Sequence, residues 1–376
     1  MPFSMRTTFP TITRESHRMS KTAVVFGGPS DEHDISILTG LQVARALGDV
    51  HAIYWSKSGE WYLVESDLEA GDFADGLPRK AREVSFVVSP GQGFVLRRKP
   101  LDISAVFIAC HGGPGEDGTL QGLFDLAGLR YTGPGRAASA LGMDKLAFGA
   151  AMASAGLPTL PRTMVSTGEE PPPEFDAPYI VKPRFGGSSI GIEVADDWAA
   201  VLALKRSSSF LDQGAVVEPF LTGSRDLQVA VRTHPEWQMS AVEAPVRSDD
   251  GIYSYHQKYL AWGGEVSDGR ELPASLEVSL EKAIYELSRR VTEVAQLRGI
   301  ARIDYLEKDG ELAVNEVNTI PGSMASYLWV EPPISRRRLF EDMMAEAETA
   351  PTRLFSVAGS DGTALRSAGT IASKLG

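Results

Sequence analysis

The sequence predicts a mixed α/β protein with more than one domain. Two continuous apolar runs, Thr22–Phe26 and Val106–Cys110, are typical of strands buried in a parallel sheet. The first run ends in a Gly-Gly pair and is followed by a segment of helical periodicity, which is the order of a βαβ unit. Near residue 310 two strands joined by a tight turn predict an antiparallel hairpin. A chain of 376 residues has room for about two or three such units.

Composition narrows the class of protein. The chain has 37 Lys+Arg against 49 Asp+Glu, a formal net charge of -12, which argues against nucleic acid as a partner. A single cysteine, Cys110, excludes an intrachain disulfide framework and fits a reducing compartment, so we expect a cytoplasmic protein. No apolar run approaches the length of about 18 residues that a membrane span needs.

Residues 1–20 are rich in Arg, Ser and Thr and lack the apolar core of a secretion signal. They resemble a transit peptide in composition, but we expect a disordered extension or a start codon assigned too early, with Met19 as the other start.

The first domain is expected over residues 21–133. After the strand Thr22–Phe26, Ser30, Asp31 and Glu32 open a helix that Gly48 ends. A helix N-terminus beside a Gly-Gly turn attracts anions, whereas Glu32 alone would be read as a partner of the helix dipole.

A Gly-rich loop, His111–Gly118, follows the strand Val106–Cys110, and a helix follows over Thr119–Leu126. Ligands of open α/β sheets bind at the carboxyl ends of strands, so His111 and Glu116 are candidate site residues. The alternative is a structural His–Glu pair.

The next segment carries a candidate phosphate site. Asp144 is expected to cap a helix that begins at Lys145, and a later apolar strand presents Lys182. A loop of Gly and Ser then leads into a strand over Ile190–Val194. Such a loop offers N–H groups and hydroxyls to phosphates and can close as a lid, whereas the plain alternative is a Gly/Ser hairpin.

Two acidic residues after this loop suit a nucleoside. Glu218 can accept from an adenine amino group and Asp226 from ribose hydroxyls. The long segment Tyr253–Arg270 is a candidate lid because long loops in compact domains often cover sites. An amphipathic helix over Leu276–Val294, with Gly299 as its stop, is read as scaffold.

The hairpin near residue 310 is a candidate metal site. Asp304 lies on its first strand, and Glu316 and Asn318 share one face of its second strand. Two carboxylates and an amide, without His or Cys, are hard oxygen ligands that suit Mg²⁺ shared with phosphates. The bland alternative is a surface hairpin with solvated charges. A last helix is expected over Ser335–Ala347, followed by a loosely held tail.

Taken together, the motifs resemble the D-alanine–D-alanine ligase family of ATP-grasp enzymes. The matching blocks run from Val24 to Ala347 and are Phe26–Ser36, His111–Gly122, Tyr131–Gly135, Met143–Lys145, Val181–Pro183, Gly187–Gly191, Lys258–Tyr259, Arg302–Asp304 and Glu316–Gly322. The resemblance implies a three-domain ATP-grasp fold, in which an N-terminal parallel α/β domain (21–133) precedes two ATP-clasping subdomains (134–219 and 220–348) and a tail (349–376).

The resemblance also implies roles for individual residues. Those implied to hold ATP are Lys145, Lys182, Ser188, Ser189, Glu218, Phe220, Leu221, Asp226, Lys258 and Asn318. Those implied to hold Mg²⁺ are Asp304, Glu316 and Asn318. Those implied to act in catalysis are Glu32, Ser188, Tyr259, Arg302 and the backbone N–H of Gly322. Those implied to contact amino-acid substrates are Glu32, Ile35, His111, Glu116, Ser323, Tyr327 and Leu328.

The implied activity joins two D-alanines for peptidoglycan precursors, using ATP and two Mg²⁺ ions, for which Mn²⁺ can substitute. A homodimer is implied by the family alone. A related ligase with D-serine, D-lactate or another amino acid as second substrate is the close alternative. A nucleotide-binding regulator without catalysis is the alternative from another class, and the intact Lys182, Asp304, Glu316 and Asn318 argue against it.

The sequence departs from the family pattern at the second substrate. Family members usually carry a Ser, which binds the carboxylate of the second D-alanine, where this chain has Tyr327. Ser323, Ser326 or the Tyr327 hydroxyl are the candidates to replace it. Gly186 stands where a Glu or Leu is usual, and the connection before Asp226 is one residue longer. Tyr259 favours an amine over a hydroxy acid as second substrate.

Overall fold

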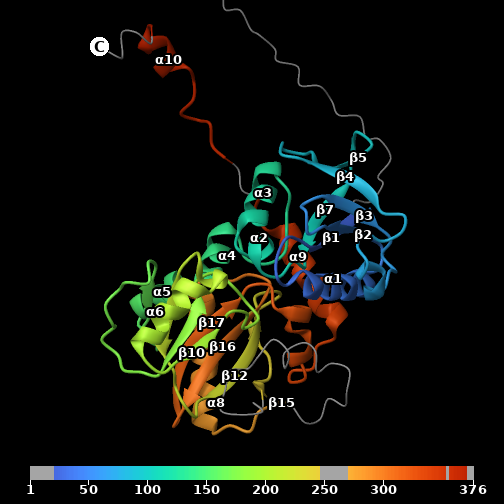
Figure 1. Ribbon diagram of the computed structural model, residues 1–376. Coiled ribbons are helices and arrows are strands. Elements are labelled where there is room, and N and C mark those ends of the chain that lie inside the picture. Colours follow the sequence, from blue (N-terminus) through green and yellow to red (C-terminus); the bar gives the residue numbers. More distant parts are fainter. Residues whose placement is uncertain (1–20, 246–269, 353–354, 371–376) are drawn as a thin grey trace, which may run out of the picture.

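The computed structural model describes residues 21–245, 270–352 and 355–370 (Figure 1). These residues form an α/β molecule in two parts. One part is built on a large sheet that begins at the N-terminus, and the other contains two smaller antiparallel sheets. Within the described ranges, no helix is both long and apolar enough to cross a membrane. Lys258 and Tyr259 lie outside the described residues, as do residues 1–20 and almost all of the candidate lid.

The first sheet combines a parallel half with an antiparallel half. Its strands are β1 (Lys21–Gly27), β2 (Val50–Trp55), β3 (Trp61–Val64), β4 (Arg82–Val87), β5 (Gly93–Leu96), β6 (Lys99–Pro100) and β7 (Ile103–Ile108), in the order β6-β5-β4-β3-β2-β1-β7. The strand β1 pairs in parallel with β2 and β7, as predicted. The strands β3 to β6 extend the sheet in antiparallel fashion. The parallel half brings the loops after β1 and β7 to one edge.

The helices of this part include the two that were predicted, after Glu32 and from Thr119, and three that were not. They are α1 (His33–Leu47), η1 (Ala70–Phe73), α2 (Gly113–Glu116), α3 (Thr119–Ala127) and α4 (Arg136–Met143). Gly48 ends α1, as predicted. The segment predicted as a Gly-rich loop contains α2, a single helical turn. Gly112 precedes it with a φ of +63°, a conformation that favours glycine.

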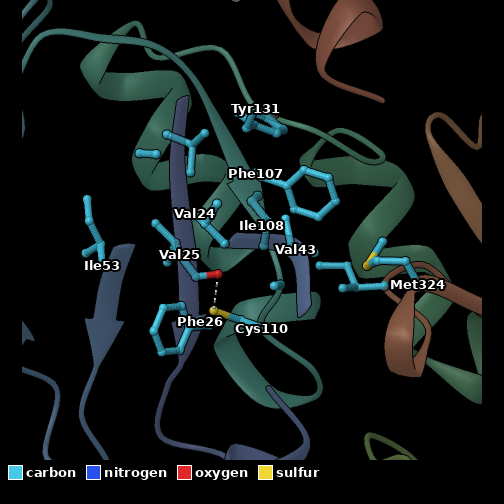
Figure 2. Close-up of a cluster of buried hydrophobic side chains, with 14 of the residues drawn as sticks. Val24, Val25, Phe26, Val43, Ile53, Phe107, Ile108, Cys110, Tyr131 and Met324 are labelled. Carbon is cyan, nitrogen blue, oxygen red and sulfur yellow. Dashed lines mark hydrogen bonds between the residues drawn. The ribbon is translucent and has the colours of Figure 1, made fainter. Parts of the chain in front are cut away.

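The core of the first sheet is completed by the C-terminal end of the chain. Val24, Val25 and Phe107 lie in one buried cluster with Met324, as Figure 2 shows. The rings of Phe107 and Phe340 meet edge to face, with centroids 5.5 Å apart. The thiol of Cys110 donates to the Val25 carbonyl at 3.6 Å (Figure 2), and its burial raises the pKa of the thiol. The first and last thirds of the chain therefore share one core.

Two antiparallel four-stranded sheets form the second part. One has the order β10-β9-β11-β8, from β8 (Thr163–Val165), β9 (Tyr179–Pro183), β10 (Glu193–Ala195) and β11 (Ala215–Pro219). The other has the order β13-β12-β16-β17, from β12 (Arg225–Arg232), β13 (Gln238–Met239), β16 (Ile300–Lys308) and β17 (Glu311–Asn318). A two-stranded sheet pairs β14 (Ala244–Pro245) with β15 (Arg270–Glu271). The predicted hairpin of β16 and β17 is confirmed.

The remaining helical segments connect these strands or follow them in the chain. They are α5 (Lys145–Ser154), α6 (Trp198–Ser207), η2 (Ser209–Leu211), α8 (Val278–Val294), η4 (Gly322–Leu328), α9 (Arg336–Thr349) and α10 (Thr363–Ala368). The Asp144 carboxylate accepts from the N–H groups of Leu146 and Ala147, which confirms the predicted cap of α5. In Figure 1, α9 lies beside the first sheet and α10 lies apart from the rest of the molecule.

Two predicted limits of elements were wrong. The strand expected from Ile190 begins only at Glu193, because turns occupy the residues between. Helix α8 ends at Val294, as its periodicity predicted, but the residue that caps it is Ala295 and not Gly299. Gly299 has a φ of +72° and packs against the Gly133 backbone, so its role is close packing between segments. The expected tail contains α10. The domain limits themselves stay a prediction.

The contact between α1 and β1 generates a test of this packing. A Cβ added at Gly40 would lie 2.3 Å from the Cβ of Phe26, so the helix must move away from the strand. We expect Gly40→Ala to lower the free energy of unfolding by about 1–3 kcal/mol, measured by urea unfolding. Gly71→Ala is the control, because nothing lies within 4 Å of its added Cβ. Equal stability of the two variants would contradict the packing described.

Candidate active site

The candidate metal ligands meet across the hairpin of β16 and β17. Asp304 lies opposite Glu316, and Arg302 lies opposite Asn318. The Arg302 guanidinium binds Asp304 through two parallel contacts, Nε to Oδ1 and Nη2 to Oδ2, each 2.7 Å. Asn318 Nδ2 donates to Asp304 Oδ2 at 3.2 Å. The bland alternative of solvated charges fails here, because Asp304 is only 6% exposed.

A buried lysine approaches the same carboxylates from α5. Lys145 Nζ lies 3.4 Å from Glu316 Oε2 and donates to the Gly186 carbonyl at 2.5 Å. Glu32 and Glu116 of the first part line the same small pocket as Lys145, Glu316 and Asn318. The candidate phosphate and metal residues therefore face the candidate substrate residues.

A cleft between the two antiparallel sheets adjoins this pocket through Glu316. Ile180 on β9 and Leu306 on β16 supply apolar surface from opposite sheets. The residues predicted for ATP that line the cleft are Lys182, Ser189, Phe220, Leu221 and Asp226. A cleft lined by apolar side chains and a few polar groups suits a nucleotide.

Glu218 lies deeper than the cleft surface and holds two cations. Its carboxylate accepts from Lys182 Nζ at 2.7 Å and lies 2.8 Å from Arg162 Nε. Lys182 also donates to Asn315 Oδ1 at 3.0 Å. Arg162 was missed from the sequence because it precedes a three-residue strand whose pattern carries no chemical signal. The pairing orients Lys182 toward the cleft.

The Gly/Ser loop is tied to the first part of the molecule. The Ser188 hydroxyl donates to Glu32 Oε1, and the Glu32 side chain is buried. Gly112 and Gly187 make room for this carboxylate, because a Cβ at either would lie within 3 Å of Glu32 Oε2. Ser188 has a φ of +53° and Ser189 of +59°, so the loop holds two strained residues at this contact.

His111 and Glu116 have separate partners rather than forming a His–Glu pair. His111 Nδ1 donates to the Ile320 carbonyl at 2.5 Å, so its Nε2 accepts from the Thr39 hydroxyl at 2.7 Å. Glu116 Oε1 accepts from the Ile320 N–H at 2.8 Å, and Oε2 accepts from the Gly112 N–H at 3.0 Å. Both residues thus hold the backbone where β17 ends.

Burial shifts the pKa of both groups. Desolvation lowers the pKa of His111, which keeps the imidazole neutral. Desolvation, and then the charge of Glu32, raise the pKa of Glu116 to about 7, against hydrogen bonds that favour its charged form.

The remaining candidates lie around η4, where Ser323 has a φ of +50°. Gly322 begins η4, and Ser323, Leu328 and Ile35 are buried. The Ser323 N–H donates to the Thr39 hydroxyl oxygen at 3.0 Å. Tyr327 is half-buried and faces Glu243 and Arg270, neither of which was predicted as a site residue.

The donor set fits a hard divalent cation. Asp304 and Glu316 lie opposite each other and carry carboxylate oxygens, and the Asn318 side chain, whose amide nitrogen here donates to Asp304, also carries an amide oxygen. In this structure the negative charge of the two carboxylates is balanced by Arg302 and Lys145. A cation bound with phosphates would meet the same carboxylates, while the Lys145 ammonium would turn to the phosphates.

The clasp of two antiparallel sheets around this cleft defines an ATP-grasp protein. Two family models match the chain, "D-ala D-ala ligase N-terminus" over residues 21–134 and "D-ala D-ala ligase C-terminus" over residues 152–344. The chain belongs to the D-alanine–D-alanine ligase family.

Relatives and solved structures agree with this membership. D-alanine--D-alanine ligases of Mycobacterium sp. (strain JLS) and Nocardia farcinica are each 32% identical, with 90% and 89% of this chain covered, and 99% and 98% of theirs. The fold matches the VanG D-Ala:D-Ser ligase of Enterococcus faecalis, with a TM-score of 0.73 and 24% identity over 87% of this chain and 98% of that one. It also matches the D-alanine-D-alanine ligase of Helicobacter pylori, with a TM-score of 0.69 and 23% identity over 89% and 99%.

The raised pKa of Glu116 predicts a pH dependence of stability. The folded protein holds the proton of Glu116 up to about pH 7, whereas the unfolded chain releases it near pH 4.5. This contribution to stability is therefore complete below pH 4.5 and is lost as the pH rises to about 7. The loss is on the order of 3 kcal/mol.

Urea unfolding at several pH values, without nucleotide or metal, measures this loss. We expect Glu116→Gln to lack it, so that its stability changes less than that of the wild type between pH 4.5 and 7. Glu286→Gln, at an exposed carboxylate of α8, should keep the wild-type profile. Parallel profiles for Glu116→Gln and the wild type would contradict the assignment.

Proposed function

We propose that this protein joins two molecules of D-alanine to D-alanyl-D-alanine, with conversion of ATP to ADP and phosphate. One observation carries the proposal: the cleft between the sheets and the small pocket share a lining residue, Glu316. Lys182 lines the cleft, and Glu32 and Lys145 line the pocket. A nucleotide in the cleft would then place its phosphates beside an amino acid held by the first part of the molecule.

The chemistry requires activation of a carboxylate. The carboxylate of the first D-alanine attacks the γ-phosphorus of ATP, the bond to the β–γ bridging oxygen breaks, and an acyl phosphate and ADP result. The neutral amine of the second D-alanine then attacks the acyl carbon. Phosphate leaves, and the amine releases one proton. Both steps concentrate negative charge, so fixed cations stabilise their transition states.

The residues of this chain divide that work. Glu32, buried and bonded to Ser188, receives the ammonium group of the first D-alanine. Lys145 and Lys182 receive the phosphates, and each is oriented by an acidic partner. Arg302 and the Gly322 N–H stabilise the oxyanion at the reacting carbon. Phe220, Leu221 and Asp226 hold the adenosine.

We assign Asp304, Glu316 and Asn318 to hold two Mg²⁺ ions, which Mn²⁺ can replace. When bound, these ions neutralise phosphate charge during transfer. The loop with Ser188 and Ser189 excludes water, which would hydrolyse the acyl phosphate. Tyr259 and Lys258, assigned to the same closed site by the family resemblance, lie outside the described residues.

The proposal extends to the setting of the enzyme. The dipeptide serves as a precursor of peptidoglycan, and the synthesis takes place in the cytoplasm, where the buried free thiol of Cys110 stays reduced. A homodimer is proposed from the family alone.

The first test measures phosphate release with ATP, Mg²⁺ and D-alanine alone, and identifies the product by mass. We expect D-alanyl-D-alanine in equal amount to the phosphate released. Release only when D-alanine is paired with another amine or hydroxy acid would mean that the second site takes a different substrate. No release with any pair would overturn the proposal.

A second test addresses the assigned ligands. Asp304→Asn removes a carboxylate charge, and we expect turnover to fall about a hundredfold or more. Asp309→Asn is the matched control, because it makes the same change in the turn of the same hairpin, where a φ of +54° suits asparagine. Circular dichroism checks that both variants fold. Unchanged turnover in Asp304→Asn would contradict the metal role.

A further inference from the structure

Three side chains that the proposed mechanism does not use form a cluster beside Arg302. Glu243 is 2% exposed, and its Oε1 lies 3.2 Å from Arg270 Nη1. The guanidinium carbon of Arg270 lies 5.1 Å from the ring centroid of Tyr327. Arg270 therefore lies between the buried carboxylate of Glu243 and the ring of Tyr327.

The sheet register places this cluster on the side of the sheet that faces the cleft. Glu243 pairs with Gln228, Gln228 lies opposite Asp304, and Asp304 lies opposite Glu316. Residues directly opposite each other share one face of a sheet. Gln228, Asp304 and Glu316 all line the cleft. Two strand spacings, or roughly 10 Å, separate Glu243 from Asp304, so the cluster borders the reacting centre without occupying it.

The two arginines of this region have different bonding partners. Arg302 commits Nε and Nη2 to Asp304. Arg270 directs Nη1 to Glu243, and its guanidinium carbon lies over the Tyr327 ring; a planar guanidinium held in this way can pair with a planar anion. Its side chain is 23% exposed, so a ligand can reach it.

The second amino acid of the proposed reaction presents such an anion. Its amine attacks the acyl carbon near Arg302, and its carboxylate lies two bonds from that amine. In the family pattern a serine hydroxyl at the position of Tyr327 binds this carboxylate. Here the Tyr327 ring lies beneath the Arg270 guanidinium, and the Ser326 hydroxyl accepts from Arg336 Nε at 3.1 Å.

We propose that Arg270 binds the carboxylate of the second amino acid, and that Tyr327 and Glu243 are positioning residues that hold its guanidinium. This inference rests on the proposed ligase function and deepens it. The substrate class is an α-amino acid with a free carboxylate, recognised by a charged fork instead of a hydroxyl. Arginine and carboxylate form paired, charge-assisted hydrogen bonds, which favour this substrate over a neutral analogue.

The test is a competition between two acceptors in one reaction. D-alanine serves as donor and acceptor, and D-alaninamide, which lacks the carboxylate, competes as acceptor. The ratio of D-alanyl-D-alanine to D-alanyl-D-alaninamide is measured by mass. Because both products come from the same acyl phosphate, the ratio is insensitive to the amount of folded enzyme, to ATP binding and to activation of the donor.

We expect Arg270→Ala to reduce the wild-type preference for D-alanine about tenfold to a hundredfold, since a hydrogen bond to a charged group is lost. Arg270→Lys should lose part of the preference, and Tyr327→Phe, which keeps the ring and removes the hydroxyl, should lose less than Arg270→Ala. Arg45→Ala is the matched control, because it breaks the pair between Arg45 of α1 and Glu69 and should keep the wild-type ratio.

The outcomes separate the two proposals. A wild-type ratio in Arg270→Ala would overturn the assignment of Arg270 and leave the ligase function standing. If Arg270→Ala yields no product, Arg270→Lys and Tyr327→Phe decide, and wild-type ratios in both would overturn the assignment. If the wild-type protein forms neither product, the ligase function is overturned, and this assignment with it.

Discussion

The structure depends on the hydrogen bonds by which side chains of the first part of the molecule hold the backbone from Thr319 to Ser323. Glu116 accepts from the Ile320 N–H, His111 donates to the Ile320 carbonyl, and Thr39 accepts from the Ser323 N–H. All three side chains are buried, so each contact replaces a hydrogen bond to water that folding removes. These hydrogen bonds lie directly after Asn318, and so they join the candidate metal hairpin to the part of the molecule that carries Glu32.

Buried carboxylates of the candidate site have cationic partners. The buried carboxylates Asp304 and Glu218 are each paired with arginine or lysine at hydrogen-bond distance. An unpaired buried charge would cost several kcal/mol. In the proposed reaction the same cations would bind phosphate or carboxylate, so ligand binding would exchange one set of anionic partners for another.

The sequence predicted the parts of the fold and site that repeat a local pattern. Alternation placed Asp304, Glu316 and Asn318 on one hairpin, and the cap at Asp144 followed from its neighbours. Arg162, Glu243 and Arg270 were missed, because each gains its meaning from a partner distant in the chain. The Gly299 stop failed for a related reason, since that glycine serves packing against Gly133 and not the end of a helix.

The shared core has a consequence for synthesis of the chain. The strands β1 and β7 leave the ribosome early, but Met324, Phe340 and Met343, which complete their hydrophobic cluster, are translated more than 200 residues after β7. The hydrophobic core of the large sheet therefore stays incomplete, with apolar surface exposed, until almost the whole polypeptide has been synthesised. A nascent chain truncated before α9 would contain every candidate ligand of ATP and metal and still lack a finished N-terminal domain.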